Sequence, residues 1–166
     1  GFPARMLVGV VLPAVNEATG SNPALWVHAL PLYEAIAMRV EHRQEFAGAA
    51  ESGIEAGLAV QNPVETMAAF LRHMTFLQKY FDGIFFSTHV VGSLFVNCLD
   101  KKHSGLSRQV MAVLCEEEVR DMVDQSSLLA SIVPCVCKHA CKSSEVEIKL
   151  HALYLLSLLM PRLGEE

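Results

Sequence analysis

Three of the five cysteines and one of the seven histidines of this chain fall within one short segment, Cys135-Val-Cys137-Lys-His139-Ala-Cys141. Thiolate and imidazole groups are ligands that Zn²⁺ prefers. On a helix, however, Cys137 and Cys141 lie one turn apart on one face, while Cys135 and His139 share a second direction, so one ion cannot collect all four. The spacing therefore favours small apolar cysteines buried in the core over a metal site. A metal-binding or enzyme-like domain built on the segment from Cys135 to Cys141 is the alternative.

The histidines stand in no recognisable catalytic sequence. The chain contains no H-E-x-x-H, G-x-S-x-G or C-x-x-C sequence and no glycine-rich phosphate loop. His28 and His151 each precede Ala-Leu near opposite ends of the chain, and such repetition indicates a structural role. We expect a protein that is not an enzyme and that holds no cofactor and no metal.

The balance of charge argues against nucleic acid as a partner. With 13 Lys and Arg against 18 Asp and Glu, the formal net charge is −5, whereas phosphate binding needs clustered basic side chains. The densest acidic run is Glu116-Glu117-Glu118, followed by Asp121 and Asp124. Such a run is usually a solvated surface, and the alternative is that it steers a basic peptide toward a binding groove.

Length, hydrophobicity and cysteine usage indicate one intracellular domain. The 166 residues are 52% hydrophobic, which suffices for a sizeable core. An odd number of cysteines without framework spacing is typical of a reducing compartment, so we expect a cytoplasmic protein, with the nucleus left open. The longest mostly apolar stretch, residues 84–99, contains five polar residues and is shorter than the roughly 20 apolar residues of a bilayer span. We therefore expect no membrane insertion.

A short sequence that occurs twice predicts how these residues are positioned. The segment VLPAV begins at Val11, and the similar segment IVPCV begins at Ile132, 121 residues later. Each is followed by His-Ala-Leu, at His28 and at His151. If two further copies lie between them, the unit is roughly 40 residues long, which is a period of stacked helical repeats.

Four helix-capping signals have this spacing. Asn22, Asn62, Ser104 and Ser144 lie 40, 42 and 40 residues apart, and their side chains can accept a hydrogen bond from the free amides of a first helical turn. Proline follows both asparagines, as is common at the first helical position. Apolar residues recur at intervals of three and four over most of the chain, and strand patterns are scarce. The sequence therefore predicts an all-α protein of four units.

Each unit is expected to contain two helices. The first helices are expected at residues 4–18, 53–60, 84–99 and 127–141. The second helices begin near the four caps and carry these apolar stripes: Ala29, Leu32, Tyr33 and Ile36; Met67, Phe70, Leu71 and Met74; Val110, Val113 and Leu114; Ala152, Leu155, Leu156 and Leu159. The repeated His-Ala-Leu sequence also predicts that Leu153 lies in the core. The units cover about residues 4–40, 41–82, 83–124 and 126–162 of a single domain, residues 1–166, which we expect to be a fragment of a longer protein.

The last unit resembles an armadillo or HEAT repeat. The residues that carry this resemblance are SLLASIVPCV from Ser127 and SEVEIKLHALYLLSLL from Ser144. The first unit is similar to it more loosely, and the resemblance covers most of the chain. It implies a right-handed α-solenoid whose second helices line a concave groove for an extended peptide or a partner helix. A short third helix in the polar stretches 39–44 and 116–125 would favour the armadillo variant over the HEAT variant.

The nuclear-import branch of the armadillo family carries a Trp and an Asn on this second helix of each unit, and the two side chains hold the cargo backbone. The Trp-like positions here are Pro31, Ala69, Ala112 and Tyr154, and the Asn-like positions are Ala35, His73, Glu116 and Leu158. None of these residues is Trp or Asn. The resemblance therefore does not extend to the binding of import cargo.

The function that we expect is a non-catalytic scaffold that binds another protein through the groove or faces of the solenoid. The contact residues that we expect are Arg72, His73, Glu116 and Tyr154. One alternative is binding to tubulin or the cytoskeleton through Asp100-Lys101-Lys102-His103, because helical repeats that bind tubulin place basic residues in such turns. A second is a purely structural segment of a longer solenoid. Self-association through uncapped terminal repeats is compatible with each of these.

Overall fold

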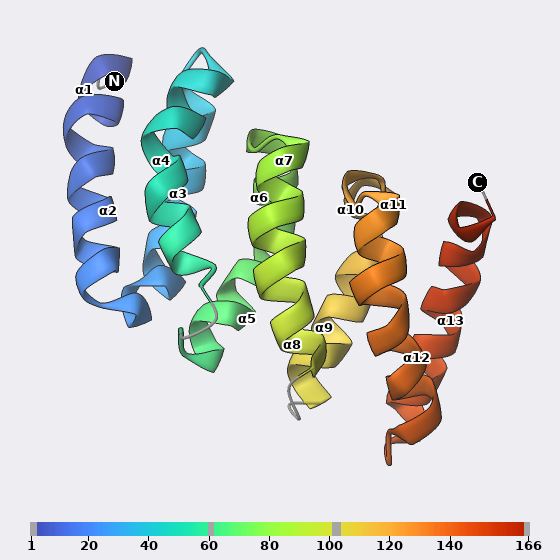
Figure 1. Ribbon diagram of the computed structural model, residues 1–166. Helices are drawn as coiled ribbons and strands as arrows, with labels where there is room; N and C mark the ends of the chain where they lie inside the picture. Colours follow the sequence, from blue (N-terminus) through green and yellow to red (C-terminus); the bar gives the residue numbers. More distant parts are fainter. Residues whose placement is uncertain (1–2, 60–61, 101–103, 165–166) are drawn as a thin grey trace. The chain divides into compact units, whose positions relative to one another are not determined.

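A computed structural model describes residues 3–59, 62–100 and 104–164 of the chain. Every regular element in these ranges is a helix, which confirms the all-α prediction (Figure 1). The contacts divide the chain into two compact units, Gly1–Asp82 and Gly83–Glu166. This division falls at the boundary expected between the second and third repeats.

The first unit consists of two helical pairs. Its helices, in chain order, are α1 (Ala4–Met6), η1 (Leu7–Val11), α2 (Leu12–Ser21), η2 (Pro23–Leu25), α3 (Trp26–Arg39), α4 (Arg43–Gly57), α5 (Val64–Arg72) and α6 (Met74–Tyr80). The segments α1, η1 and α2 form one continuous helix. α2 packs against α4 and α3 packs against α5, so that the first helices of the two pairs lie together, as do the second helices.

The second unit repeats this plan. Its helices are α7 (Gly83–Phe85), η3 (Phe86–Phe95), α8 (Val96–Asp100), α9 (Ser104–Leu114), α10 (Glu117–Met122), α11 (Gln125–Ser127), η4 (Leu128–Ile132), α12 (Val133–Lys142) and α13 (Val146–Leu163). α8 packs against α12 and α9 packs against α13. α10 is the short third helix expected within residues 116–125. The one expected within residues 39–44 is absent, because α3 continues to Arg39 and α4 begins at Arg43.

The helix expected at residues 53–60 begins ten residues earlier than predicted. α4 starts at Arg43 and ends at Gly57, and the expected end at residue 60 lies outside the described residues. Between Ala47 and Gly53 the sequence is Ala-Gly-Ala-Ala-Glu-Ser-Gly, which carries no large apolar side chain. Small residues pack closely but produce no apolar periodicity, so the pattern in the sequence concealed the first half of this helix.

The two prolines of the repeated sequence have the same local structure. Pro13 and Pro134 lie at the start of α-helical segments that directly follow the π-helical segments η1 and η4. In these segments the N–H groups of Leu12 and Val133 donate to carbonyls five residues back. A proline has no N–H, and its ring crowds the carbonyl four residues before it, so a widened turn lets the helix continue. η3 has the same π geometry without a proline.

Of the four predicted helix caps, one is confirmed and two are wrong. Asn22 accepts a hydrogen bond from the Ala24 amide at 3.2 Å, as expected of a cap. Asn62 does not cap the following helix, because its amide donates to the last carbonyls of α4 at 2.8 and 2.7 Å. Ser144 is not a cap either, since its neighbour Ser143 accepts from the Glu145 amide at 3.2 Å. The side chain of Ser104 lies outside the described residues.

Equivalent positions of the four helical pairs are buried at a nearly constant spacing. On the first helices the buried positions, 39, 40 and 42 residues apart, are Leu7, Phe46, Phe86 and Leu128. On the second helices the two buried sets, both spaced 40, 40 and 42 residues apart, are Trp26, Thr66, Leu106 and Ile148, and Leu30, Phe70, Val110 and Ala152. We call this alignment of the four pairs the repeat register.

Two predicted core positions are wrong. Leu32 is 42% exposed and Leu153 is 56% exposed. Aligning the two His-Ala-Leu sequences places Leu153 at the position of the buried Leu30. In the repeat register, Ala152 and not Leu153 lies at the position equivalent to Leu30. One residue on a helix turns the side chain through about 100°, which moves it from the buried side to the surface. The other predicted stripe residues are buried, except Val113 and Leu156, which are half-buried.

A polar link between three helices holds the first unit together. The Tyr33 hydroxyl on α3 donates to the Asn16 carbonyl oxygen on α2, and the Asn16 amide donates to the Ala49 carbonyl on α4 at 3.0 Å. Tyr33 is fully buried, and burial raises the pKa of its hydroxyl. The group therefore stays a neutral hydrogen-bond donor at neutral pH. This link joins the first helical pair to the second.

A network of two half-buried arginine side chains closes the second unit. Arg162, near the end of α13, donates to the carbonyls of Arg120 and Val123, the latter at 2.7 Å. Arg120 in turn donates to the Leu114 carbonyl at the end of α9 at 3.2 Å. Charge-assisted bonds to the last carbonyls of a helix satisfy groups that have no partner within the helix. They connect α9, α10 and α13.

Asp124 provides a pH-dependent cap for the helix that begins with α11. Its carboxylate accepts from the Ser127 hydroxyl at 2.6 Å and from the Ser127 amide at 2.9 Å, and these bonds lower its pKa. Ser87 on η3 adds a hydrogen bond of 3.1 Å. Because the folded-state pKa lies below the unfolded-state value, the stabilisation is present above the ordinary Asp pKa of about 3.9 and is lost as the pH falls through the lowered value.

We expect Asp124→Ala to lower the free energy of unfolding by about 0.5 to 2 kcal/mol at neutral pH, the usual cost of losing such a cap. Asp124→Asn keeps a capping oxygen that does not titrate. The wild type should therefore lose stability relative to Asp124→Asn when the pH falls below about 4. Urea unfolding followed by circular dichroism between pH 3 and 7 measures both effects, and a wild-type difference from Asp124→Asn that is constant over this range would contradict the assignment.

One described helix, Gly83–Asp100, is long and apolar enough to cross a membrane by length and composition. Its side chains at Phe86, Val90 and Leu94 are buried, and it packs against α9 and α12. A core helix of a soluble protein meets the same criterion. The helix therefore gives no argument for or against a membrane.

Candidate functional site

The four predicted contact residues lie on second helices or directly after them. Arg72 ends α5 and is exposed, and His73 follows it at the break between α5 and α6. Glu116 is exposed immediately before α10, and Tyr154 on α13 is 59% exposed. The first two residues belong to the first unit and the other two belong to the second. Within each unit they lie on or beside the second helices.

His73 is not a free contact residue. Its Nδ1 atom lies 3.5 Å from a carboxylate oxygen of Glu34 on α3, so the imidazole joins the two second helices of the first unit. Its amide donates to the Ala69 and Phe70 carbonyls at the end of α5. The side chain is about a quarter exposed. His73 thus presents an edge to solvent while it holds the helix break in place, and neighbouring Arg72 is the more accessible of the pair.

Glu116 ends a sharp turn between α9 and α10. Its carbonyl accepts from the amides of Val119 and Arg120, at 3.1 and 3.0 Å, and its carboxylate is exposed. The neighbouring Cys115 is half-buried, and burial raises the pKa of its thiol. A raised pKa keeps the sulfur protonated at neutral pH, which makes Cys115 a poor nucleophile. The turn offers a negative contact group and no activated thiol.

The repeat register brings two of the predicted residues to equivalent positions. Leu32, Arg72, Ala112 and Tyr154 are spaced 40, 40 and 42 residues apart and all are exposed. We call these four residues the exposed row. The sequence alignment placed Pro31 and Ala69 at the positions equivalent to Ala112 and Tyr154. The structure places Leu32 and Arg72 there, which are one and three residues further along the chain. Leu32 was missed as a surface residue because its apolar side chain was counted in the core.

The cysteine segment does not form a closed group. Cys137 and Cys141 on α12 are exposed, which contradicts the prediction that they are buried. Cys135 is half-buried, and burial raises the pKa of its thiol. His139 lies 2.7 Å from the Leu99 carbonyl at the end of α8. Among the described residues, no group of three or more His, Cys, Asp or Glu side chains lies close enough to hold a metal ion.

The basic turn expected to contact tubulin is only partly described. Residues 101–103, which include both lysines and the histidine, lie outside the described residues. Asp100 is described, and its carboxylate lies 3.8 Å from the ammonium group of Lys138 on α12. This exposed pair contributes at most about 1 kcal/mol to stability. It attaches the end of α8 to the neighbouring repeat.

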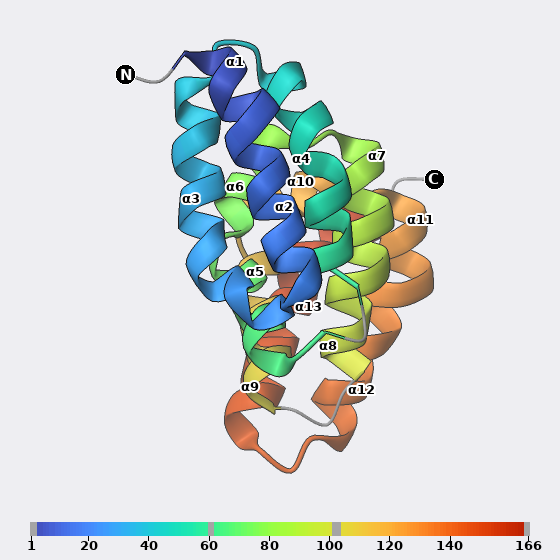
Figure 2. The same cartoon turned by 90° about the vertical axis from the view of Figure 1, so that its left-hand side faces the viewer.

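An apolar groove that the sequence did not predict lies between α2 and α3. Its volume is about 500 Å³, and Figure 2 looks onto these two helices, which run side by side in front. The lining residues are Val10, Val11, Ala14, Val15, Ala18, Thr19, Leu25, His28, Ala29 and Leu32. Val10 is 60% exposed. The sequence does contain a signal for this groove: a second apolar line along η1 and α2, at Val10, Ala14 and Ala18, recurs at intervals of four.

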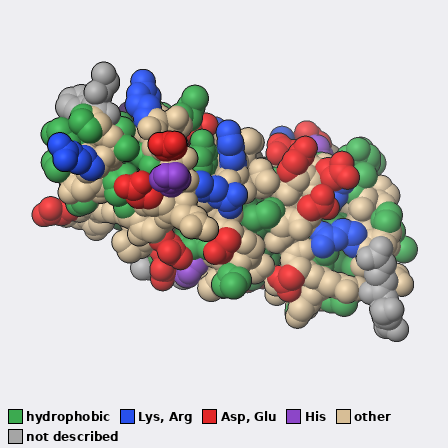
Figure 3. All heavy atoms as spheres, turned by 90° about the horizontal axis from the view of Figure 1, so that it is seen from above, with side chains coloured by type: hydrophobic (Ala, Val, Ile, Leu, Met, Phe, Trp, Pro, Cys, Tyr) green, Lys and Arg blue, Asp and Glu red, His purple; other side chains and the backbone are tan. Residues whose placement is uncertain are grey.

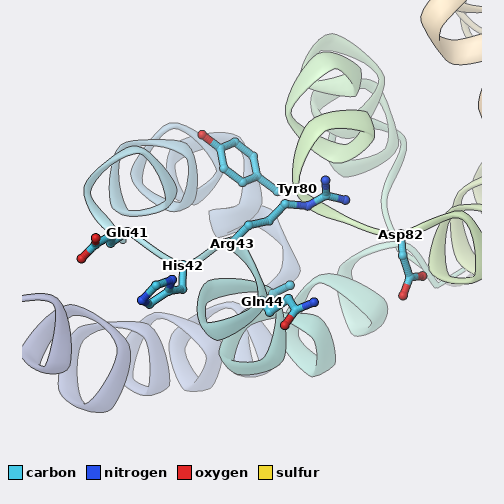
Figure 4. A pocket seen from close by; sticks show the side chains of 7 residues that line it. Glu41, His42, Arg43, Gln44, Tyr80 and Asp82 are labelled. Carbon is cyan, nitrogen blue, oxygen red and sulfur yellow. The ribbon is translucent and has the colours of Figure 1, made fainter.

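A polar pocket of about 600 Å³ lies at the other side of the first unit, where α3 leads into α4. Figure 4 shows Glu41 and His42 on one side, Asp82 on the other, and Arg43 between them. The Arg43 guanidinium donates to the Phe81 carbonyl at 3.2 Å. The side chains do not converge on one point, as general acid–base or nucleophilic catalysis requires. The pocket is better described as the solvated end of a helix pair.

Glu116, Glu117 and Glu118 are all exposed, so the acidic run gathers negative charge at the start of α10. On the face that Figure 3 shows, side chains of both signs are present. Arg108 on α9 pairs with Glu145 and Glu147 of the next repeat at 3.8 and 3.5 Å. Such pairs set the contact between neighbouring helices and contribute little stability.

No family model, no curated protein and no solved structure matches this chain. The candidate site is therefore defined by its own geometry. That geometry consists of the exposed row on the second helices and of the apolar groove in the first unit.

Proposed function

We propose that this chain is a non-catalytic protein-interaction scaffold, a right-handed solenoid of four armadillo-like or HEAT-like repeats that binds a partner peptide or helix along its second helices. The observation that carries the proposal is the exposed row. Leu32, Arg72, Ala112 and Tyr154 recur with the same spacing as the buried residues of the repeat register. Each repeat thus presents one solvent-facing position on its second helix.

The physical argument starts from the packing of the repeats. A single helical pair cannot bury its own apolar stripe, so neighbouring pairs complete it, and the second helices retain one free side. Within the first unit α3 lies beside α5, and within the second unit α9 lies beside α13. Within each unit, the equivalent exposed positions on neighbouring second helices form one surface, which suits a peptide or a helix better than a small molecule.

The side chains of the exposed row are suited to protein contacts. Arg and Tyr are enriched among residues that dominate binding energy at interfaces. Arg72 can bond a carboxylate or a backbone carbonyl of a partner, and Tyr154 presents an aromatic ring with a polar end. Leu32 adds an apolar contact at the edge of the α2–α3 groove. The free thiols of all five cysteines agree with a place inside the cell.

The test is affinity capture from a cell extract with the wild type and with a threefold variant that combines Arg72→Ala, Glu116→Ala and Tyr154→Ala. His73 is left unchanged because it pairs with Glu34 on α3. We expect the variant to keep its helical circular dichroism and to lose the proteins that the wild type retains specifically. For a partner identified in this way, calorimetry should show that Tyr154→Ala weakens binding by about tenfold or more.

A matched control replaces two exposed residues of the first helices, Glu51→Ala on α4 and Lys142→Ala on α12. The control should capture the same proteins as the wild type. If the wild type, the threefold variant and the control capture identical proteins with equal affinity, Arg72, Glu116 and Tyr154 are not contact residues and the proposal is wrong.

A further inference from the structure

Two of the five cysteines are exposed, and both lie on α12. These are Cys137 and Cys141, whereas Cys98 is buried and Cys115 and Cys135 are half-buried. Cysteine is among the residue types that are most often buried, so two exposed thiols on one helix differ from the usual structural role of this residue. We call Cys137 and Cys141 the thiol pair. Neither residue belongs to the exposed row, so the proposed function makes no use of them.

The helix places the two thiols side by side. α12 is α-helical from Val133 to Lys142, and Cys137 and Cys141 lie four residues apart on one side of it. At this spacing the two Cβ atoms are about 5 to 6 Å apart. Lys138 and Lys142 directly follow the two cysteines and point about 100° away from them around the helix. The thiol pair therefore occupies a side of the helix that carries no competing ammonium group.

The two sulfur atoms of the thiol pair have no partner within residues 3–59, 62–100 and 104–164. No hydrogen bond or ion pair in these ranges involves either of them. The other two soft ligands of the segment are turned away, since His139 lies 2.7 Å from the Leu99 carbonyl on α8 and Cys135 is half-buried. In the described ranges no third His, Cys, Asp or Glu side chain completes a larger group. The thiol pair is thus an open site of two soft ligands.

The spacing of the thiol pair suits a bridging ion better than a disulfide. A disulfide holds the two Cβ atoms about 3.5 to 4.5 Å apart, which is closer than an intact helix places them. A thiolate lies about 2.3 Å from a bound metal ion, so one ion can hold two sulfur atoms up to about 4.6 Å apart. Rotation about the two Cα–Cβ bonds can bring the sulfur atoms within this range without unwinding the helix.

The number of ligands selects the class of ion. In structural sites Zn²⁺ takes four ligands in a tetrahedral arrangement, and the thiol pair supplies only two. Cu⁺ is a soft ion for which thiolates are the preferred ligands, and it forms stable complexes with two thiolates in a nearly linear arrangement. Each thiol loses its proton when the ion binds, so two protons are released and the complex of two thiolates with one Cu⁺ carries one negative charge.

We propose that the thiol pair of α12 is an intramolecular site for one Cu⁺ ion, which the sulfur atoms of Cys137 and Cys141 hold between them on the exposed side of the helix. The ion links two successive turns of α12. Binding therefore stabilises the end of this helix, and the thermal unfolding midpoint rises with the concentration of free ion. The site does not depend on the exposed row or on partner binding.

The experiment is a titration under anaerobic conditions with Cu⁺ supplied as its coloured bicinchoninate complex, from which the protein withdraws the ion. The wild type should withdraw one ion per chain with high affinity. Loss of an outer-shell partner of a ligand already weakens metal binding by about 10-fold to 100-fold. Cys137→Ser and Cys141→Ser each remove one of only two ligands, so each should weaken binding by at least about 100-fold. Cys98, Cys115 and Cys135 remain in every variant and set the background.

A matched control moves one thiol by a single residue. The variant that combines Cys141→Ser with Lys142→Cys keeps the number of thiols but places the two about 140° apart around the helix. It should bind Cu⁺ as weakly as Cys141→Ser. Lys142→Ser, which keeps the thiol pair and removes the same charge, should bind as tightly as the wild type. Equal affinity of the moved-thiol variant and the wild type would overturn the proposal.

X-ray absorption at the copper edge and native mass spectrometry test the coordination. We expect two sulfur neighbours, no nitrogen neighbour and one copper ion on one chain. A nitrogen neighbour would mean that a histidine replaces one thiolate, and one ion shared by two chains would mean that the site is not intramolecular. Either result overturns the proposal, as does a wild type that binds no more tightly than the double variant Cys137→Ser, Cys141→Ser. All these positions are exposed, so circular dichroism of the ion-free variants should match the wild type.

Discussion

Trp26→Ala should lower the free energy of unfolding by about 3 to 5 kcal/mol, the usual cost of removing a large buried aromatic side chain. Trp26 is 2% exposed. Its ring lies 5.2 Å from the ring of Tyr33 and 5.0 Å from that of Phe70, so it joins the two second helices of the first unit. A Cβ atom at Gly57 would come within 2.6 Å of both Trp26 and Phe70, which shows how tightly this cluster is packed. Its removal therefore leaves a cavity.

Urea unfolding followed by circular dichroism at 222 nm measures this loss without using tryptophan fluorescence, since Trp26 is the single tryptophan. Trp26→Phe keeps an aromatic ring and should cost markedly less. Met38→Ala, at a position 73% exposed on the same helix, should change stability by less than about 0.5 kcal/mol. A loss below about 1 kcal/mol for Trp26→Ala would mean that the aromatic cluster does not hold the two pairs together.

Leu155→Ala should cost about 2 to 5 kcal/mol, whereas Leu153→Ala should cost less than about 1 kcal/mol. The two leucines lie two residues apart on α13 and undergo the same change in side chain and helix propensity. They differ in burial, because Leu155 is fully buried and Leu153 is 56% exposed. The difference between the two variants therefore isolates burial from every other effect.

Under conditions in which sedimentation finds monomers, urea midpoints of the two variants give the comparison directly. Equal losses would support the His-Ala-Leu alignment, in which Leu153 is a core residue, and would contradict the repeat register. A loss for Leu153→Ala that appears only at high concentration would agree with self-association.

The helical class and the positions of most helices follow from local chemistry. Apolar intervals of three and four, a cap such as Asn22 and the prolines of the repeated sequence each act within a few residues, so they can be recognised without the fold. Where the local signal fails, the prediction fails too. The small residues of α4 concealed half of a helix. The Asn62 side chain bonds back to the carbonyls at the end of α4, which lies five residues before it, and so does not cap the next helix.

The candidate site was harder to predict because it depends on the rotation of each helix. An error of one residue turns a side chain through about 100°, enough to exchange core and surface. Tyr154 and Arg72 were placed on the surface correctly, while Leu32 and Leu153 were assigned to the core. His73 was predicted as a contact residue, and its bond to Glu34 comes from a helix 39 residues away. Such a pairing leaves no mark in the local sequence.

The sequence by itself determined that the chain is helical, because helix propensity and apolar periodicity are local properties. Only the tertiary structure decided which apolar side chains are covered. Leu155 and Leu153 are alike in chemistry, yet one packs against neighbouring helices and the other faces solvent. Burial depends on what lies beside a helix, so the apolar groove between α2 and α3 became visible only when the neighbours of each helix were known.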